Sequence, residues 1–371
     1  MAHGENAPLS ITPGAIRFNT DSMKLEYFRI STEGGNTGSS DGRGTLAAGE
    51  WVQLTTDSPD IQTGGTRGLV MGGYNPSNTY LDEIVYINIA TTGNSLTFGE
   101  LTVSDRNHVN MGVSDRTRAI SAGGAKVGDI KTADIEYVTM ASTGNAVDFG
   151  ADLTGTRYGG GPVSNGTRGV FMGGNPGSGA VGSDIIDYIT IASTGVAAQD
   201  FGNLTQSIQY PAASMCSSTR GIHAGGRIYP LYKAEVDYIT ISTQGNAGDF
   251  GDLTFARAHG TSGSITSNSI RGLVMGGYAT PTYYNDIEYF TIATLGNSQD
   301  FGDLLSAKGS AAGAAASPTR CVMAGGASPA YTDTIQYVQI MTTGNAVDYG
   351  DLNTQITAWG AGASNGHGGL G

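Results

Sequence analysis

The sequence predicts an all-β fold: a six-bladed β-propeller with four strands per blade, preceded by a short N-terminal β-hairpin segment. Three observations lead to this prediction. A unit of about fifty residues recurs six times along the chain. Each unit contains runs of alternating or β-branched residues and no run with helical periodicity. A Gly pair ends the most apolar run of every unit, as expected where a buried strand enters a tight turn.

The first element is the segment that does not carry the repeat, residues 1–56. Its stretch GAIRFNTDSMKLEYFR predicts a β-hairpin with NTDS as the turn, and the strand-like WVQL follows a Gly/Ser-rich stretch. Such a segment is too small to fold alone, and its hairpin carries Ile16, Phe18, Leu25 and Tyr27. We expect residues 1–56 to anchor the chain to a partner surface. Packing on the chain's own propeller is the alternative.

The second element is the propeller, residues 57–371. Its first landmark, TRGLVMGG, returns in six versions, each with a basic residue at the same place. The repeated arginines are Arg67, Arg118, Arg168, Arg220, Arg271 and Arg320. We expect them to be structural, because a residue present in every unit does not mark a single site. Hydrogen bonds to backbone carbonyls, or to the repeated carboxylates Glu136, Asp237 and Glu288, would tie neighbouring blades together.

Two further landmarks complete each unit: a strand such as DYITIAS and an aromatic–Gly step such as DFGDL. A weaker, glycine-rich strand precedes each arginine, and Gly-Asn between the last two strands indicates a hairpin. This order of a glycine-rich strand, a strand ending in Gly-Gly, an acidic-x-aromatic strand and a final aromatic resembles the kelch repeat. Tyr–Phe pairs stand where kelch repeats usually have Tyr–Trp. The resemblance implies a kelch-like propeller.

The end of the chain predicts how the ring closes. After the last DYGDL, the tail continues to SNGHGGLG, which parallels residues 164–171. We expect residues 356–371 to supply the glycine-rich strand of the first blade. The competing choice for that strand is DSPDIQTGG, just before Arg67.

The amino-acid composition excludes several classes of partner and cofactor. With 19 Lys+Arg against 32 Asp+Glu, the net charge of −13 and the lack of a basic stripe argue against nucleic acid. The apolar runs are too short to span a bilayer, so no membrane insertion is expected. Two cysteines make no disulfide framework, and five histidines show no metal-ligand spacing. No metal or other cofactor is therefore expected.

A second resemblance concerns function. The phrase PGAIRFNTDSMKLEYF, followed by EWVQL, resembles a module of structural proteins of tailed bacteriophages. The repeats TRGVFMGG, IDYITIAST and DFGDLT are similar to those of marine phage and cyanophage virion proteins. The resemblance implies a non-enzymatic virion structural protein, assembled in the host cytoplasm and displayed on the tail, a fibre or the head. It also implies contacts with other virion proteins through residues 1–56. Because the hairpin of this segment needs a partner surface, we further hypothesise that it brings chains together as a homo-oligomer such as a trimer.

Candidate binding residues lie where the units differ. The loops after the Gly-Gly pairs diverge in sequence and are expected on one face of the ring. They hold seven tyrosines: Tyr74, Tyr80, Tyr229, Tyr232, Tyr278, Tyr283 and Tyr284. Tyrosines beside Asn and Asp suit the sugar rings of a host-surface glycan, and they suit protein contacts equally well.

No catalytic constellation emerges from the sequence. Five carboxylates precede the aromatic–Gly step: Asp148, Asp200, Asp249, Asp300 and Asp348. Their recurrence favours turn capping over a single asymmetric site. A carbohydrate-active enzyme, either a hydrolase or a lyase, is the alternative function. A cellular kelch adaptor is a third, although such adaptors normally carry an extra helical module.

Overall fold

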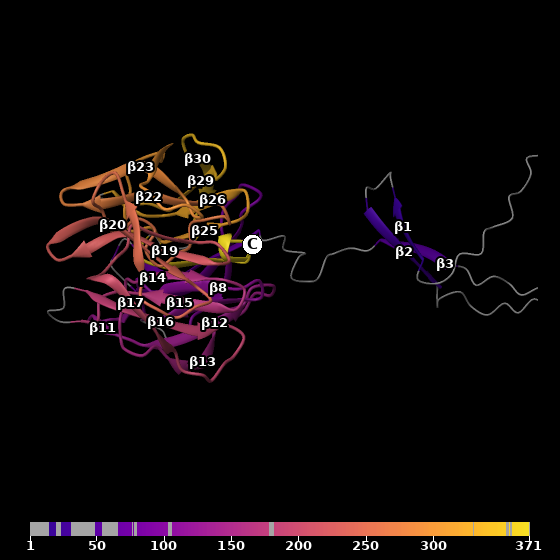
Figure 1. Cartoon of the computed structure of the whole chain (residues 1–371), viewed down its shortest axis with the longest axis horizontal. Helices are drawn as coiled ribbons and strands as arrows, with labels where there is room; N and C mark the ends of the chain where they lie inside the picture. Colours follow the sequence, from indigo (N-terminus) through magenta and orange to yellow (C-terminus); the bar gives the residue numbers. More distant parts are fainter. Residues whose placement is uncertain are drawn as a thin grey trace, which may run out of the picture. The chain divides into compact units, whose positions relative to one another are not determined.

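The structure is a computed structural model of the chain (Figure 1). It describes residues 15–19, 24–30, 49–53, 66–75, 77, 80–102, 106–177, 182–328, 330–353, 356 and 358–370. The chain forms two compact units, residues 1–62 and 63–371. The boundary predicted after residue 56 lies outside the described residues. Within the described ranges there is no α-helix, and no helix is long and apolar enough to cross a membrane.

The smaller unit contains a three-stranded antiparallel sheet in the order β1-β2-β3. Its strands are β1 (Ile16–Asn19), β2 (Lys24–Ile30) and β3 (Gly49–Gln53). The pairing of β1 with β2 confirms the predicted hairpin, and the strand that carries Trp51 adds a third member beside β2. Ile16 is 64% exposed. The side chains of Phe18, Leu25 and Tyr27 lie outside the described part of the chain.

The larger unit is a six-bladed β-propeller of antiparallel sheets (Figure 1), as predicted. From the inside outward, the first blade consists of β31 (Ala361–Ser364), β4 (Arg67–Tyr74), β5 (Tyr80–Asn88) and β6 (Leu96–Glu100). The second consists of β8 (Met111–Ser114), β9 (Arg118–Ala122), β12 (Asp134–Thr139) and β13 (Val147–Asp152). The third consists of β14 (Gly161–Ser164), β15 (Arg168–Met172), β16 (Ser183–Thr190) and β17 (Gln199–Ile208).

The remaining blades follow the same plan. The fourth consists of β18 (Ala213–Cys216), β19 (Arg220–Ile228), β20 (Leu231–Thr240) and β21 (Gly248–Asp252). The fifth has β22 (Arg271–Ala279), β23 (Thr282–Thr291) and β24 (Gln299–Asp303), with residues 261–267 in the innermost place through the bridge Ser267–Gly272. The sixth consists of β25 (Gly313–Ala316), β26 (Arg320–Ala324), β29 (Thr334–Gln339) and β30 (Val347–Asp351).

Short strands lie in three of the loops, and a 3₁₀ turn lies in the C-terminal tail. The strands are β7 (Arg106–His108), β10 (Ala125–Lys126), β11 (Ile130–Lys131), β27 (Ala327–Ser328) and β28 (Ala330–Tyr331). The turn is η1 (Gly368–Leu370).

Ring closure occurs through the C-terminal strand. β31 pairs with β4, with Ala361 opposite Met71 and Ser364 opposite Gly68. The innermost strand of the first blade therefore comes from the other end of the chain, which confirms the predicted closure. The competing segment, residues 57–65, lies outside the described residues.

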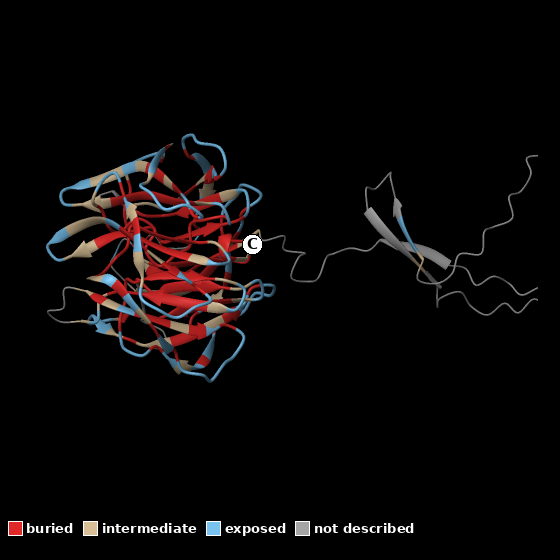
Figure 2. Ribbon diagram, in the orientation of Figure 1, coloured by how far each residue is buried: buried red, intermediate tan, exposed pale blue. Residues whose placement is uncertain are grey.

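The hydrophobic core is divided among the junctions between blades (Figure 2). Each of six buried clusters joins residues from two neighbouring blades. Phe98 of the first blade, for example, packs with Val138 of the second. Val322 of the sixth blade packs with Val85 of the first. The last junction is therefore built like the other five, because side chains of similar size return at the same places in each unit.

The repeated arginines link each blade to the next. Arg220 of the fourth blade donates from Nη1 to the carbonyl oxygen of Ile292 in the fifth, at 2.8 Å. Its guanidinium carbon lies 4.8 Å from the ring centroid of Tyr238 in its own blade. Arg320 repeats this link across the closure and donates to the carbonyl of Ala90 at 2.8 Å. Four of the arginines each bind one carbonyl, and two of them each bind a pair; the acceptors are Met140, Ile241, Ile292, Ile340, the pair Ile191 and Ala192, and the pair Ile89 and Ala90. Of the two expected kinds of acceptor, these arginines use the carbonyls.

The Gly-Asn loops form a second link, which the sequence did not predict. They join the outer two strands of a blade, as expected of a hairpin, and they also bind the preceding blade. The Gly296 N–H donates to the Phe250 carbonyl at 2.9 Å, and Asn297 Oδ1 accepts from the Asp252 N–H at 3.1 Å. A Cβ added at Gly251 would lie 2.5 Å from the Gly296 carbonyl oxygen. The same close approach explains the glycine after the aromatic residue in four other blades, at Gly99, Gly202, Gly302 and Gly350. In the second blade, Gly150 is instead required by its φ of 78°.

Candidate functional site

A cycle of backbone hydrogen bonds surrounds the axis of the ring. Six residues, one ahead of each innermost strand, have φ between 53° and 65°: Val109, Gly159, Tyr210, His259, Ser310 and Trp359. The N–H of each donates to the carbonyl of its equivalent in the preceding blade. Val109 N–H, for example, donates to the Trp359 carbonyl at 2.6 Å, and Tyr210 N–H to the Gly159 carbonyl at 2.6 Å. We call these six residues the axial ring. The six hydrogen bonds form a closed circle, because Trp359 is bonded both to Ser310 and to Val109. This circle of backbone groups narrows one end of the central channel.

A pocket with a cavity volume of about 370 Å³ lies against the axial ring. We call it the axial pocket. It is lined by Tyr74, Tyr210, Arg227, His259, Tyr278, Tyr283, Ser310, Tyr331 and Trp359. Aromatic side chains contact one another across its floor. The rings of Tyr210 and His259 lie 4.4 Å apart, and those of His259 and Trp359 meet edge to face at 5.0 Å. Seven of the nine lining residues are therefore aromatic, and their hydroxyl and ring nitrogen groups, with Arg227 and Ser310, make the pocket polar as well.

Three of the seven predicted tyrosines line this pocket: Tyr74, Tyr278 and Tyr283. Two others support its wall. Tyr80 packs on Tyr74 with ring centroids 4.7 Å apart. Tyr232 meets the ring of Tyr278 edge to face at 5.9 Å, and its hydroxyl lies 2.9 Å from Thr280 Oγ1.

The other two predicted tyrosines do not line the axial pocket. Tyr229 is 65% exposed and lies beside the Arg227 guanidinium, whose carbon is 5.3 Å from the ring centroid. Tyr284 follows Tyr283 on β23 and contacts different residues. Its ring stacks on Phe255 at 5.9 Å, and the Arg257 guanidinium carbon lies 5.7 Å from its centroid. Successive residues of a strand point to opposite faces, which explains why only one member of the pair reaches the pocket.

Six pocket residues were not among the predicted ones: Tyr210, Arg227, His259, Ser310, Tyr331 and Trp359. Four of them, Tyr210, His259, Ser310 and Trp359, belong to the axial ring, at a position where every unit has a different residue. Alignment of the six units would show this variation immediately ahead of the repeated glycine-rich strand. What the sequence does not show is that this position meets its equivalents at the axis.

Three phenols of the pocket, those of Tyr74, Tyr210 and Tyr283, keep their protons at neutral pH because the pKa of each is raised. Burial, followed by the neighbouring Tyr80, raises the pKa of Tyr74 above its ordinary value. Burial, followed by the neighbouring Tyr158, raises the pKa of Tyr210 in the same way. Burial, followed by Tyr278, also raises the pKa of Tyr283. The pocket therefore offers neutral hydroxyl groups, which can both donate and accept hydrogen bonds.

The opposite end of the innermost strands carries a set of buried hydroxyl and thiol groups. Ser164 donates to the Ser114 carbonyl at 2.9 Å, and Cys216 Sγ donates to the Ser164 carbonyl at 3.2 Å. Ser364 on the closing strand donates to the Ala316 carbonyl at 2.6 Å. Each of these bonds joins a blade to the one before it. Small polar residues thus hold the innermost strands together where larger side chains would not fit.

His367 of the C-terminal tail is buried against this set, with 1% of its surface exposed. Its Nδ1 accepts from the Gly369 N–H at 3.2 Å, so Nε2 carries the proton and donates to the Ser114 carbonyl at 3.1 Å. Cys216 Sγ lies 3.7 Å from Nδ1. Burial lowers the pKa of His367 to about 4 and raises the pKa of Cys216 to about 11. A neutral imidazole beside a protonated thiol lacks the thiolate that nucleophilic catalysis needs.

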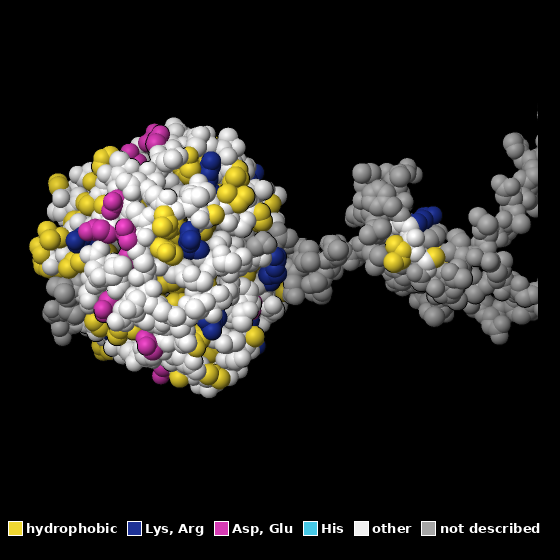
Figure 3. All heavy atoms as spheres, viewed as in Figure 1, with side chains coloured by type: hydrophobic (Ala, Val, Ile, Leu, Met, Phe, Trp, Pro, Cys, Tyr) yellow, Lys and Arg dark blue, Asp and Glu magenta, His cyan; other side chains and the backbone are white. Residues whose placement is uncertain are grey.

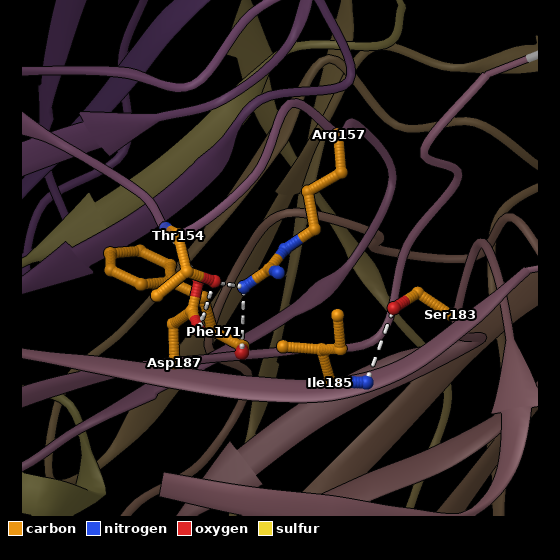
Figure 4. A network of polar contacts seen from close by, with 6 residues as sticks. All are labelled: Thr154, Arg157, Phe171, Ser183, Ile185 and Asp187. Atoms are coloured by element: carbon orange, nitrogen blue, oxygen red, sulfur yellow. Dashed lines mark hydrogen bonds and ion pairs between the residues drawn. The ribbon is translucent and has the colours of Figure 1, made fainter. Parts of the chain in front are cut away.

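Buried carboxylates lie between blades, away from the axial pocket. Asp187 accepts from Thr154 Oγ1 at 2.7 Å and from Arg157 Nη2 at 2.8 Å, while Arg157 also reaches the Phe171 carbonyl (Figure 4). Burial lowers the pKa of Arg157, and the charge of Asp187 opposes that shift. The same position in other blades holds Glu136, Asp237 and Glu288, each bound by a threonine of the preceding blade. These acids join blades and are already bound by protein groups.

No model of a protein family matches this chain, and no curated protein matches its sequence. The β-propeller is therefore shown by the structure itself. Among the described residues, no group of three or more His, Cys, Asp or Glu side chains is placed to hold a metal ion.

Proposed function

We propose that this chain is a non-enzymatic structural protein of a tailed-phage virion that binds a saccharide of the host surface in its axial pocket. The observation that carries the binding role is the pocket itself. Elsewhere in the ring the same residues return in each blade, whereas the residues that line this pocket differ from blade to blade. Most of these lining residues are aromatic. Sugar rings stack on aromatic faces, while their hydroxyl groups bind phenols, imidazoles and guanidinium groups.

Two features favour binding over catalysis. Glycoside hydrolysis ordinarily needs two carboxyl groups that flank the scissile bond, and no Asp or Glu is among the described residues that line the axial pocket. The buried carboxylates, such as Asp187, are held by threonine and arginine between blades. A carbohydrate-active enzyme remains the second candidate, and release of reducing sugar from a bound polysaccharide would favour it.

The virion role rests on the resemblance of residues 1–56 and of the repeats to phage structural proteins. In this proposal the N-terminal unit, with its three-stranded sheet, binds other virion proteins and brings chains together as a homo-oligomer such as a trimer. On the face of the propeller in view, Lys and Arg side chains lie apart from one another (Figure 3), which favours partners other than nucleic acid.

Antibody labelling tests the virion role. Particles of the phage that encodes the chain should bind an antibody raised against the propeller, and electron microscopy should place the label on the tail, a fibre or the head. The number of labels at each position would report the number of copies. Purified particles that contain none of this chain by mass spectrometry would contradict the role.

Two adjacent tyrosines test the binding role. Tyr283 lines the axial pocket, whereas Tyr284 stacks on Phe255 elsewhere. Tyr283→Ala should therefore weaken attachment of the purified chain to host cells by roughly tenfold, the loss expected for one aromatic contact. Tyr284→Ala is the matched control and should retain attachment, provided that both variants keep the melting temperature of the folded chain. Equal attachment of Tyr283→Ala and the wild type would exclude the axial pocket as the contact site.

A further inference from the structure

One side chain gives the axial pocket a formal charge. Arg227, at the end of β19, is the only Lys, Arg, Asp or Glu among the described residues that line it. The chain as a whole has a net charge of −13. Acidic residues outnumber basic ones in the chain as a whole, but the described lining of the axial pocket has one basic residue and no acidic one.

The guanidinium of Arg227 is held by aromatic rings. Its carbon lies 5.3 Å from the ring centroid of Tyr210 and 5.3 Å from that of Tyr229. Across the described residues, this side chain makes neither a salt bridge nor a hydrogen bond, and its buried Nε has no acceptor. Ring faces accept no strong hydrogen bond, so the N–H groups of the guanidinium remain available for a ligand. The aromatic contacts fix the position of the charge without neutralising it.

Other charges near the pocket do not compensate Arg227. Asp129 acts electrostatically on Tyr74, but its carboxylate is already paired with Lys131 at 2.5 Å. The buried acids of the blade junctions are bound by their own partners, as Glu288 is by Arg257 at 2.9 Å. An anion that enters the pocket would therefore meet one unpaired guanidinium and several neutral donors.

The size of the pocket limits the ligand. A cavity of about 370 Å³ is near the lower end of the range for small-molecule sites, roughly 300–1,000 Å³. The axial ring closes its floor, because the six backbone groups are bonded to one another. Such a pocket fits the terminal residue of a glycan better than an internal stretch of a long chain.

We infer that the axial pocket takes a terminal sugar that carries a carboxylate, with the carboxylate on Arg227 and the sugar ring against the aromatic wall. This inference rests on the proposed saccharide site and names its ligand class. A planar carboxylate matches the fork of a guanidinium and can accept two parallel hydrogen bonds. Tyr74, Tyr278 and Ser310 provide hydroxyl groups for the remainder of the sugar. Uronic acids and nonulosonic acids share this chemistry.

Calorimetric titration of the full chain tests the inference. The probes are the methyl glycosides of glucuronic acid and N-acetylneuraminic acid, the methyl ester of each, and a sulfated N-acetylglucosamine. At least one acid should bind roughly tenfold more tightly than its ester, because a hydrogen bond to a charged group contributes that much or more. Comparison of the affinities of the two acids shows whether the pocket prefers a uronic acid or a nonulosonic acid.

Variants assign that preference to one side chain. Arg227→Gln should lose the advantage of the acid over its ester, and Arg227→Lys should keep only part of it, because a lysine retains the charge but not the fork. Arg116→Gln removes the same charge outside the pocket, where Arg116 binds the Leu370 carbonyl at 2.6 Å, and should bind as the wild type does. Melting temperatures establish that each variant is folded.

The outcomes separate this inference from the proposed function. If acid and ester bind equally, if the sulfated sugar binds as tightly as the acid, or if Arg227→Gln keeps the preference, the inference is wrong. The saccharide site would still stand if the esters bind and Tyr283→Ala abolishes that binding. If no probe binds and Tyr283→Ala attaches to host cells as the wild type does, both the inference and the saccharide site fail.

Discussion

At the scale of single residues, His223 and His367 show how strongly this protein buries ionisable groups. Burial lowers the pKa of each to about 4, and both side chains are at most 2% exposed. His367 uses both ring nitrogens for neutral hydrogen bonds inside the channel. A proton added to either imidazole would be a buried charge without a partner, which is costly.

These two histidines predict a loss of stability in mild acid. Between pH 6.5 and 4 the unfolded chain binds protons on them and the folded chain does not, so the free energy of unfolding falls as the pH falls through that window. Each pKa difference corresponds to about 3 kcal/mol at most. Denaturant titration at pH 7.5 and 5.0 measures the loss, and His367→Gln should show a smaller one than the wild type. The same loss in both proteins would contradict the assignment to His367.

The pair Tyr283 and Tyr284 shows what sequence could and could not predict at this scale. Both stand in a divergent loop and strand, so both were predicted as binding residues. Alternation along β23 separates them, and the sequence already contains that alternation. Trp359 and Tyr210 are different. They fall in segments that read only as weak strands, and their meeting at the axis depends on contacts between residues more than 100 positions apart in the chain.

At the scale of elements, each blade depends on glycines that let the next blade approach. A Cβ added at Gly99, at the end of β6, would lie 2.2 Å from the carbonyl oxygen of Gly144 in the second blade. That oxygen belongs to backbone that is itself held, because the Gly144 N–H donates to the Phe98 carbonyl at 2.9 Å. Neither partner can move without loss of the link between the blades.

Gly99→Ala should therefore destabilise the propeller by about 2 kcal/mol, a typical cost of overpacking. Gly155 is a matched control, since nothing lies within 4 Å of a Cβ added there. Chemical denaturation of both variants gives the two changes in free energy of unfolding. A Gly99→Ala variant as stable as Gly155→Ala would show that the blades separate more easily than the structure indicates.

The elements themselves were largely predictable, because each strand has a local signature. The Gly-Gly pair predicted a tight turn at the end of a buried strand, and the pairs Gly72–Gly73 and Gly276–Gly277 have the positive φ that suits such a turn. The closing strand β31 was predicted because SNGHGGLG repeats an internal pattern. The docking of Gly-Asn loops on the preceding blade was not predicted, since a hairpin signal describes two strands and carries no information about a neighbouring sheet.

At the scale of the whole molecule, a nearly regular ring becomes asymmetric at its axis. The arginine links, the hydrophobic junctions and the Gly-Asn loops recur around the ring and across the closure between the sixth and first blades. At one end of the axis the C-terminal tail fills the channel with His367 and η1. At the other end, the axial ring supports a pocket whose residues differ from blade to blade. The repeated residues thus build the ring, and the different ones provide a single site within it.

Tryptophan fluorescence tests this view of the axial pocket most directly. The chain has two tryptophans, Trp51 in the N-terminal unit and Trp359 in the pocket. In a Trp51→Phe variant all tryptophan emission comes from Trp359. Addition of host-surface polysaccharide should change that emission in a saturable way, and the change should disappear when Tyr283 is replaced by Ala. Polysaccharide that binds the variant, as measured by calorimetry, without altering Trp359 emission would contradict the axial pocket as the binding site.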